Sequence, residues 1–176
     1  SWGVSTRLMG ALIMTHSDDA GLVLPPKLAP FQVVIVPIYK SDDEFDEISN
    51  FSKSIKSTLE KVGISVKFDD RTSHKPGWKF AEYELKGVPL RLSIGSRDLL
   101  NNTVEVARRD NMIKENVNVS MISERILYLL DDIQKKLYER AKDYRDKNTF
   151  EVNNYNDFKN IIDKGGFVSA HWDGTK

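Results

Sequence analysis

The chain has 176 residues, of which 26 are basic and 26 acidic, and it contains no cysteine. The absence of cysteine excludes disulfides, thiol chemistry and cysteine-ligated zinc within this chain, and it fits a reducing, cytoplasmic compartment. The formal net charge of zero excludes a global field that would draw the chain onto nucleic acid or anionic lipid. No apolar run approaches the roughly 20 residues of a membrane span, so we expect no membrane partner.

The N-terminal segment, residues 1–29, is unusually apolar for a chain end. Residues 2–6 alternate weakly, as a strand does, and residues 8–14 are apolar on nearly every side, which is typical of a buried helix. Such a helix needs a surface to pack on. Pro25 and Pro26 then indicate an extended linker that leads to a domain boundary. Because the chain opens at Ser1 rather than Met, we expect a piece of a longer protein.

A β-α-β unit is predicted next. Residues 31–39 form a continuous apolar run, which predicts a strand buried on both faces, as in a parallel or mixed sheet. Ser41 and Glu44 carry the signature of a capping box at the start of a helix. Residues 64–68 predict the second strand of the unit. The helix between the strands has apolar residues at helical spacing: Phe45, Ile48, Phe51, Ile55, Leu59 and Val62.

The stretch from residue 74 to residue 99 concentrates charged residues near the ends of predicted elements. Residues 78–86 predict a short helix that Gly87 ends, and residues 88–94 predict a strand. The residues of this helix expected to face the core are Trp78, Phe80, Ala81 and Leu85. The charged residues of the stretch include Glu84, Lys86, Arg91, Arg97 and Asp98. The pattern fits a binding site on rigid elements, and it also fits, more simply, a helix and a strand with solvated charges.

Residues 67–114 are the only positive third of the chain, with 10 basic and 7 acidic side chains, which is weak evidence for an anionic partner. Residues 103–109 and 112–119 predict a hairpin around Asp110 and Asn111. Ser120 is expected to cap a long helix. The apolar stripe of that helix comprises Ile122, Ile126, Leu129, Ile133, Leu137, Ala141 and Tyr144.

After residue 148 the sequence predicts a smaller appendage. Asn153 or Asn154 is expected to cap a helix, and residues 167–171 predict a strand. One helix and one strand cannot build a core alone, so we expect either a packed appendage or the start of a further domain.

Few side chains suggest catalysis. His16 with Asp18 and Asp19 could hold a metal or move a proton, but two acids after a helix more often serve as its cap. His74 and His171 lack the spacing of zinc ligands, and the chain has no phosphate-binding glycine loop and no nucleophile elbow.

The first 30 residues, SWGVSTRLMGALIMTHSDDAGLVLPPKLAP, resemble the third signature motif of class II aminoacyl-tRNA synthetases, in the version of the prolyl-tRNA synthetases. The following text, with PGWKF, E-L-KGVP-R and G-RD, resembles the anticodon-binding domain of the archaeal/eukaryotic-like prolyl enzymes. The long helix and the segment NNYNDFKNIIDKGGFV resemble the next portion of that type, which leads into an extra C-terminal domain.

The resemblance implies a parent enzyme, a homodimer, that activates proline with ATP and Mg²⁺ and transfers it to tRNA(Pro). Arg7 matches the ATP-contacting arginine of the motif, and Ser5 matches a hydroxyl residue near the nucleotide. A guanidinium suits a polyphosphate because it is permanently charged and bidentate. The other catalytic motifs and the proline pocket would lie upstream, so we expect no catalytic residue and no cofactor in this chain alone. Relatives often carry a zinc-binding cysteine near the position of Trp172, so zinc is not expected here either.

The resemblance also implies an intact anticodon reader. Proline anticodons share two guanines, which the family reads as unpaired bases. An arginine or lysine can donate to guanine O6 and N7, a carboxylate can accept from N1–H and N2–H, and an aromatic ring can stack on a base. The positions that match the anticodon contacts of the family are Phe80, Glu84, Arg91, Asp98 and Lys114.

We therefore expect an α/β fold with a mixed sheet of about five strands flanked by helices, plus a partial α+β appendage. The expected parts are the tail of a catalytic domain (1–29), the anticodon-binding domain (30–147) and the start of an extra domain (148–176). One alternative is a small-molecule site at the ends of strands 31–39 and 64–68, where Asp69, Asp70 and Arg71 lie, although a local ion pair explains these residues more simply. Another is an oligomerisation module driven by residues 8–14.

Overall fold

The computed structural model describes residues 3–172 and Gly174, and the chain divides into two compact units, Ser1–Gln134 and Lys135–Lys176. Each unit is described by itself below. The expected three-part division at 29/30 and 147/148 stays a prediction. No helix in the described part of the chain is both long enough and apolar enough to cross a membrane.

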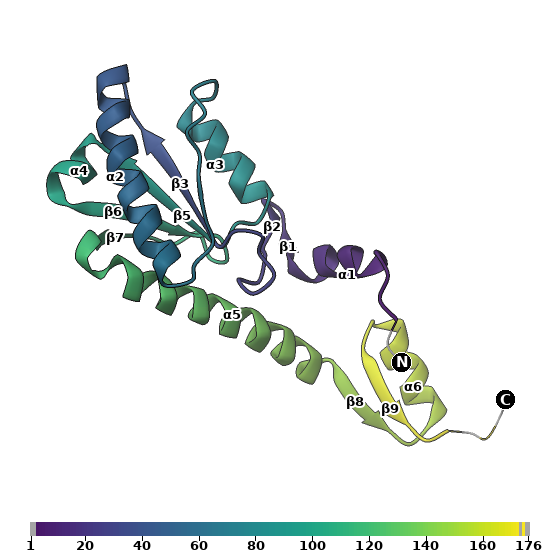
Figure 1. Ribbon diagram of the computed structural model, residues 1–176. Helices are drawn as coiled ribbons and strands as arrows, with labels where there is room; N and C mark the ends of the chain where they lie inside the picture. The colour runs from purple at the N-terminus through teal and green to yellow at the C-terminus, as the bar shows by residue number, and fades with distance from the viewer. Residues whose placement is uncertain (1–2, 173, 175–176) are drawn as a thin grey trace. The chain divides into compact units, whose positions relative to one another are not determined.

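The first unit is built on a five-stranded mixed sheet (Figure 1). Its strands are β3 (Val33–Ile38), β4 (Val66–Phe68), β5 (Leu90–Gly95), β6 (Thr103–Arg108) and β7 (Lys114–Asn118). Their order is β4-β3-β5-β6-β7; β3 is parallel to β4 and β5, whereas β6 is antiparallel to β5 and β7. The predicted α/β class, the β-α-β unit and the hairpin are confirmed.

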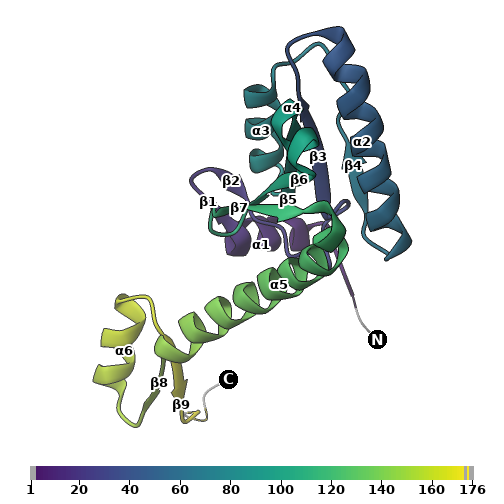
Figure 2. The same cartoon turned by 90° about the vertical axis from the view of Figure 1, so that its left-hand side faces the viewer.

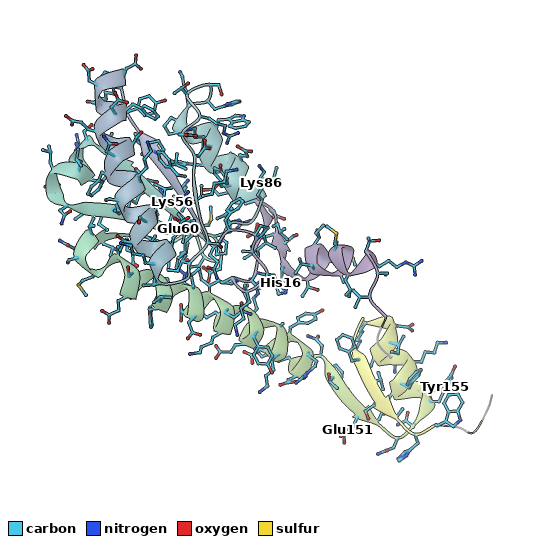
Figure 3. All side chains as sticks on the ribbon, in the orientation of Figure 1. His16, Lys56, Glu60, Lys86, Glu151 and Tyr155 are labelled. Atoms are coloured by element: carbon cyan, nitrogen blue, oxygen red, sulfur yellow. The ribbon has the colours of Figure 1, made fainter. Side chains whose placement is uncertain are left out.

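Helix α2 (Asp42–Lys61) connects β3 to β4 and covers one face of the sheet. Ser41 caps it by accepting a hydrogen bond from the Glu44 N–H at 3.4 Å, while the Glu44 carboxylate accepts from the Lys40 N–H at 2.8 Å. The predicted Ser41 cap is therefore present. A capping box would have the Glu44 carboxylate accept from the Ser41 N–H, and here it accepts from the N–H of the preceding residue, Lys40. The apolar stripe is confirmed at Ile48, Ile55 and Leu59, which are buried, but Val62 is exposed. On the outer side, Lys56 and Glu60 pair at 3.7 Å (Figure 3).

Helix α3 (Pro76–Leu85) covers the opposite face of the sheet, and Figure 2 shows the strands between α3 and α2. Its predicted core face is confirmed only at Phe80, which packs against the core. Trp78, Ala81 and Leu85 are exposed, whereas Lys79 and Tyr83 are buried. The reason is Asp69, a buried carboxylate beside β4 that lies 3.5 Å from the Lys79 ammonium and accepts a hydrogen bond from the Tyr83 hydroxyl. A buried carboxylate needs such partners, so it determines which side of the helix turns inward.

Gly87 ends α3 as predicted, with a φ of +72° that favours glycine. The residue also lies against β2 (Gly21–Leu22), which forms a short hairpin with β1 (Ser17–Asp18). A Cβ at Gly87 would lie 2.4 Å from the Leu22 carbonyl oxygen, so only glycine allows this approach.

The N-terminal segment differs from its prediction in two respects. Trp2 lies outside the described residues, and residues 3–5 form no strand. Helix α1 (Arg7–His16) is confirmed as a helix, but it is not buried. Its apolar side chains Leu8, Met9, Ile13 and Met14 are exposed by 50–82%. Apolarity alone predicts the helix and its need for cover, while burial requires a surface that the described residues do not supply.

Two helices follow β5 and β7. Helix α4 (Ser96–Asn101) was not expected, because the sequence there predicted only the end of a strand and a turn. Helix α5 (Ile122–Lys147) follows a single 3₁₀ turn, η1 (Val119–Met121). The predicted cap Ser120 instead donates its N–H to the Asn118 side chain at 3.0 Å. The apolar stripe is confirmed from Ile122 to Leu137, whereas Ala141 and Tyr144 are exposed.

The second unit holds the end of α5 and a small α/β layer. Strand β8 (Thr149–Val152) pairs in parallel with β9 (Phe167–Ala170), and α6 (Tyr155–Asp163) connects them. Asn154 caps α6 by accepting from the Asp157 N–H at 2.9 Å, as predicted. Strand β8, which carries Glu151 (Figure 3), was missed because its sequence is short and half polar.

Candidate nucleic-acid interface

The face of the sheet that carries α3 is apolar under the helix and polar beyond it. Under the helix, Val34 and Val36 of β3 pack with Tyr83 and Val88. Beyond it, Arg91 is in register with Ala107 and Lys114, and Ser93 is in register with Glu105 and Asn116. Residues in register across a sheet point to the same side. We call these five residues the polar sheet face: Arg91, Ser93, Glu105, Lys114 and Asn116.

Arg91 is the centre of this surface. Its guanidinium carbon lies 3.6 Å from the centroid of the Phe80 ring, and its Nη1 lies 3.4 Å from the Glu84 carboxylate. The side chain is only 8% exposed, and burial lowers the pKa of Arg91, against the opposite effect of Glu84 and Glu105. The structure thus brings together three of the residues that the family resemblance indicates.

A cavity beside this cluster is lined by Phe80, Glu84 and Arg91, together with Tyr83, Val88, Ala107, Arg108 and Arg109. Its volume is about 20 Å³, which is room for one water molecule and not for a base. A nucleobase would therefore bind on the surface, above the stacked Arg91 and Phe80 side chains, rather than inside the fold.

Lys114 and Asp98 lie farther away. Lys114 is on the same face as Arg91 and two strands across, roughly 10 Å at ordinary strand spacing. It is half exposed and lies 3.7 Å from Glu105. Asp98 is in α4, beyond the end of β5, and accepts a hydrogen bond from the Gly95 N–H at 2.9 Å. Four residues of strand separate Gly95 from Arg91, roughly 13 Å, so Asp98 is not part of the Arg91 cluster.

A buried ionic network fixes the helix that supplies Phe80 and Glu84. Lys79 donates to the Asp69 carbonyl at 3.0 Å, and Arg71 bridges the Asp69 and Glu82 carboxylates. Burial by itself raises the pKa of a carboxyl, but the hydrogen bonds from Arg71 and Tyr83 outweigh it and hold the pKa of Asp69 below its usual range. The network therefore sets both the position and the rotation of α3.

Arg109 fastens the other end of the same helix. Its Nε donates to the Glu84 carbonyl at 2.9 Å, and its Nη1 donates to Asp18 at 2.8 Å. The hydrogen bond from Arg109 lowers the pKa of Asp18 to about 2. Asp18 is thus a structural ion-pair partner, which leaves the suggested metal or proton-transfer role of His16, Asp18 and Asp19 without support.

The remaining candidates do not form a catalytic group. Ser5 and Arg7 are exposed, and no group of three His, Asp or Glu residues within 3–172 is placed to hold a metal. His74 stacks on Trp78, with 3.8 Å between the ring centroids. His171 lines a cavity of about 490 Å³ in the second unit with Tyr155, Phe158 and Trp172. Asp69 is buried and paired with Arg71 and Lys79, so the alternative of a small-molecule site at this residue is not favoured.

Comparison with known proteins decides the family. A family model described as "Anticodon binding domain" matches residues 32–129, which is more than half of the chain. The chain belongs to the anticodon-binding domain family. The matched range of this anticodon-binding domain includes the whole polar sheet face, the Phe80–Glu84–Arg91 cluster and Asp98, and it excludes Ser5 and Arg7.

Curated relatives named proline–tRNA ligase match the anticodon-binding domain and its flanking segments over 99% of this chain. The protein of Christiangramia forsetii is 60% identical over 176 residues, and those of Porphyromonas gingivalis and Flavobacterium johnsoniae are each 59% identical, over 175 and 176 residues. The match covers 36% of each of these relatives, so the chain spans about a third of their length.

Sequence reasoning missed three residues of the polar sheet face: Ser93, Glu105 and Asn116. A signal for Glu105 was present. It lies between Val104 and Val106, and strand alternation turns it away from the core that these valines enter. Its position opposite Ser93 and beside Arg91, however, depends on the strand register, which the sequence alone did not establish.

Proposed function

We propose that this anticodon-binding domain binds the anticodon loop of tRNA(Pro) as part of a proline–tRNA ligase. The observation that carries the proposal is the Arg91 cluster. A buried arginine is stacked on an aromatic ring and lies beside a carboxylate, within the region matched by the family model. It shares the polar sheet face with Lys114 and Glu105, whose side chains are 54% and 34% exposed. Such a surface offers donors and acceptors to the edges of unpaired bases.

The chemistry of each side chain supports a role in reading guanine. The Arg91 guanidinium has five N–H donors and, among the described residues, a single close contact to a carboxylate, so it can donate to guanine O6 and N7. Glu84 can accept from the N1–H and N2–H groups. Because the Arg91 guanidinium covers one face of the Phe80 ring, we assign Phe80 to supporting Arg91 more than to stacking on a base. Lys114 can contact the RNA backbone or a base from the far side of the polar sheet face.

For the whole protein we propose the activity named in its relatives, the ATP-dependent joining of proline to tRNA(Pro). We further propose that it is a cytoplasmic homodimer of the archaeal/eukaryotic-like type, with parts at 1–29, 30–147 and 148–176. Ser5 and Arg7 would contact ATP there, which suits an exposed guanidinium. We propose that Mg²⁺ accompanies the ATP in the whole protein.

A binding measurement with two RNAs tests the proposed function. One is a stem–loop with a proline anticodon, and the other is the same stem–loop with both shared guanines replaced by adenine. At one fixed salt concentration we expect the unchanged loop to bind at least tenfold more tightly, since each mismatched base typically costs about 1–3 kcal/mol. Equal affinities for the two loops would contradict the proposal.

A further inference from the structure

Two carboxylates, not one, flank the Arg91 guanidinium. The Glu84 carboxylate, from α3, lies 3.4 Å from Arg91 Nη1. Glu105, on β6, is opposite Ser93 and two residues from Ala107, the residue that pairs with Arg91. Strand register puts Glu105 on the same face of the sheet as Arg91, and the attraction of both carboxylates acts to raise the pKa of Arg91 against the effect of burial. The two lie on different elements, so they reach the polar sheet face from opposite sides of Arg91.

The contact of Glu105 with Lys114 contributes little to the stability of the fold. The Glu105 carboxylate is 34% exposed, and its ion pair is with Lys114, whose ammonium lies 3.7 Å away and is 54% exposed. Exposed pairs of this kind contribute little to stability. Apart from this ion pair, the Glu105 carboxylate accepts no hydrogen bond from residues 3–172, so both of its oxygens can accept one from a ligand.

The surface around Glu105 holds two buried polar atoms without a protein partner. Ser93 Oγ, on the residue opposite Glu105, and Arg91 Nε are both buried and lack a hydrogen bond. Ser93 is 2% exposed and Arg91 is 7% exposed. Buried polar groups normally have a partner, so these two atoms, on one face of β5, need one that the described residues do not supply, a water molecule or a ligand.

We propose that Glu105 is a second guanine-reading carboxylate, so that Glu84 and Glu105 each accept from the Watson–Crick edge of one guanine, with Arg91 between them. The inference rests on the proposed function and deepens it. Guanine is the base whose edge presents two adjacent donors, N1–H and N2–H, which match the two oxygens of a carboxylate. One carboxylate on each side of Arg91 corresponds to the two guanines that proline anticodons share.

The test uses the whole chain and three stem–loops: one with the proline anticodon, and two in which one guanine or the other is replaced by inosine, which lacks the N2 amino group. The variants are Glu105→Gln and Glu84→Gln. Glu115→Gln is the matched control, because Glu115 is on the same sheet but on the opposite face, paired with Arg125 at 2.7 Å. Thermal melting of each variant monitors the fold.

We expect Glu105→Gln to bind the unchanged loop about tenfold more weakly, the loss of one good base contact. In this variant, inosine at one guanine position should cost nothing further, while inosine at the other keeps its full penalty. Glu84→Gln should show the reverse pattern, and Glu115→Gln should bind as the unmodified chain does. Crossed patterns assign each carboxylate to its base.

The inference is overturned if Glu105→Gln binds all three loops as the unmodified chain does, or if both inosine penalties persist in full in it. In those cases the losses with Glu84→Gln still support anticodon binding. If Glu105→Gln has a lower melting temperature than the unmodified chain, Glu105→Asp is used instead. Its carboxylate is one methylene shorter, so it should lose the same inosine penalty. Retention of both penalties overturns the inference. Failure of the proposed function is distinct, because then the unmodified chain itself binds the proline loop and the loop with both guanines replaced by adenine equally.

Discussion

Arg91 is a buried cation that lies 3.6 Å from the centroid of the Phe80 ring and 3.4 Å from the Glu84 carboxylate. These two contacts orient the guanidinium and leave most of its donors uncommitted. Truncation would therefore remove both a base contact and part of the packing around Phe80. A charge-preserving substitution separates the two effects, because lysine keeps the charge but lacks the planar fork.

We expect Arg91→Lys to weaken binding of the proline stem–loop by about 1–3 kcal/mol, with little further loss when one of the two guanines is substituted. The reason is that the fork of Arg91 reads that base. Filter binding at fixed salt measures the effect, and thermal melting should change little. A uniform weakening of every loop, with both guanine preferences intact, would instead assign Arg91 to a phosphate.

The Asp18–Arg109 pair makes stability depend on pH. The pKa of Asp18 is about 2 in the folded chain, below its ordinary value of 3.8, and the hydrogen bond from Arg109 is the largest cause. A lowered folded pKa means that the pair stabilises the fold above about pH 4 and that this contribution is lost as the pH falls towards 2. We expect Asp18→Asn to lower the free energy of unfolding at pH 7, and the difference from the unmodified chain to shrink between pH 4 and pH 2. Urea unfolding at several pH values measures it.

Asp19→Asn is the matched control for that measurement, since Asp19 is adjacent and exposed but makes no contact with Arg109. A difference between Asp18→Asn and the unmodified chain that persists undiminished at pH 2 would show that the ion pair is not its cause. The Asp18 side chain is 46% exposed, so solvent screening keeps the whole effect small.

The elements of the first unit are joined most tightly where α3 ends. Gly87 combines a positive φ with a backbone contact to Leu22, while Gly63 has a φ of +84° and nothing within 4 Å of a Cβ. We expect Gly87→Ala to destabilise the fold by clearly more than Gly63→Ala, which should cost about 1 kcal/mol from backbone strain alone. Equal losses in melting experiments on the two variants would mean that β2 does not press on Gly87 in solution.

Helix α1 presents an apolar surface that is not covered in the single chain. Leu8, Met9, Ile13 and Met14 are exposed, and contiguous apolar patches mark interaction surfaces. We expect the chain to self-associate through α1, and the double variant Met9→Lys with Met14→Lys to sediment as a monomer with little change in melting. Leu100→Lys, which removes an exposed leucine of α4, is the control and should not change the association state. A monomeric unmodified chain with α1 helical would contradict this expectation.

At the scale of the whole molecule, this chain should not activate proline by itself. It spans about a third of its proline–tRNA ligase relatives, and its two candidate ATP contacts, Ser5 and Arg7, are exposed side chains that line neither of the two cavities described above. We expect no proline-dependent exchange of pyrophosphate into ATP above background. Exchange that depends on proline and is abolished by Arg7→Ala would show a working catalytic site in this chain.

Sequence alone determined most of the sheet. A strand buried on both faces appears as a continuous apolar run, as at residues 33–37, and the amphipathic helices α2 and α5 carry a periodic stripe. Family resemblance identified three members of the Arg91 cluster, Phe80, Glu84 and Arg91, because their side chains come from adjacent elements of one local stretch. The short, half-polar strand β8 gave no such signal, since its partner lies about 15 residues farther along the chain.

Only the tertiary structure decided which side of α3 is buried, because the deciding partner, Asp69, is on a different element. It likewise decided that Asp98 is separated from Arg91, and that Glu105 and the unpartnered Ser93 lie beside it. The physical reason is the same in each case. Local sequence determines the period of an element and hence its faces, whereas strand register and buried ion pairs between distant residues determine which face meets which neighbour.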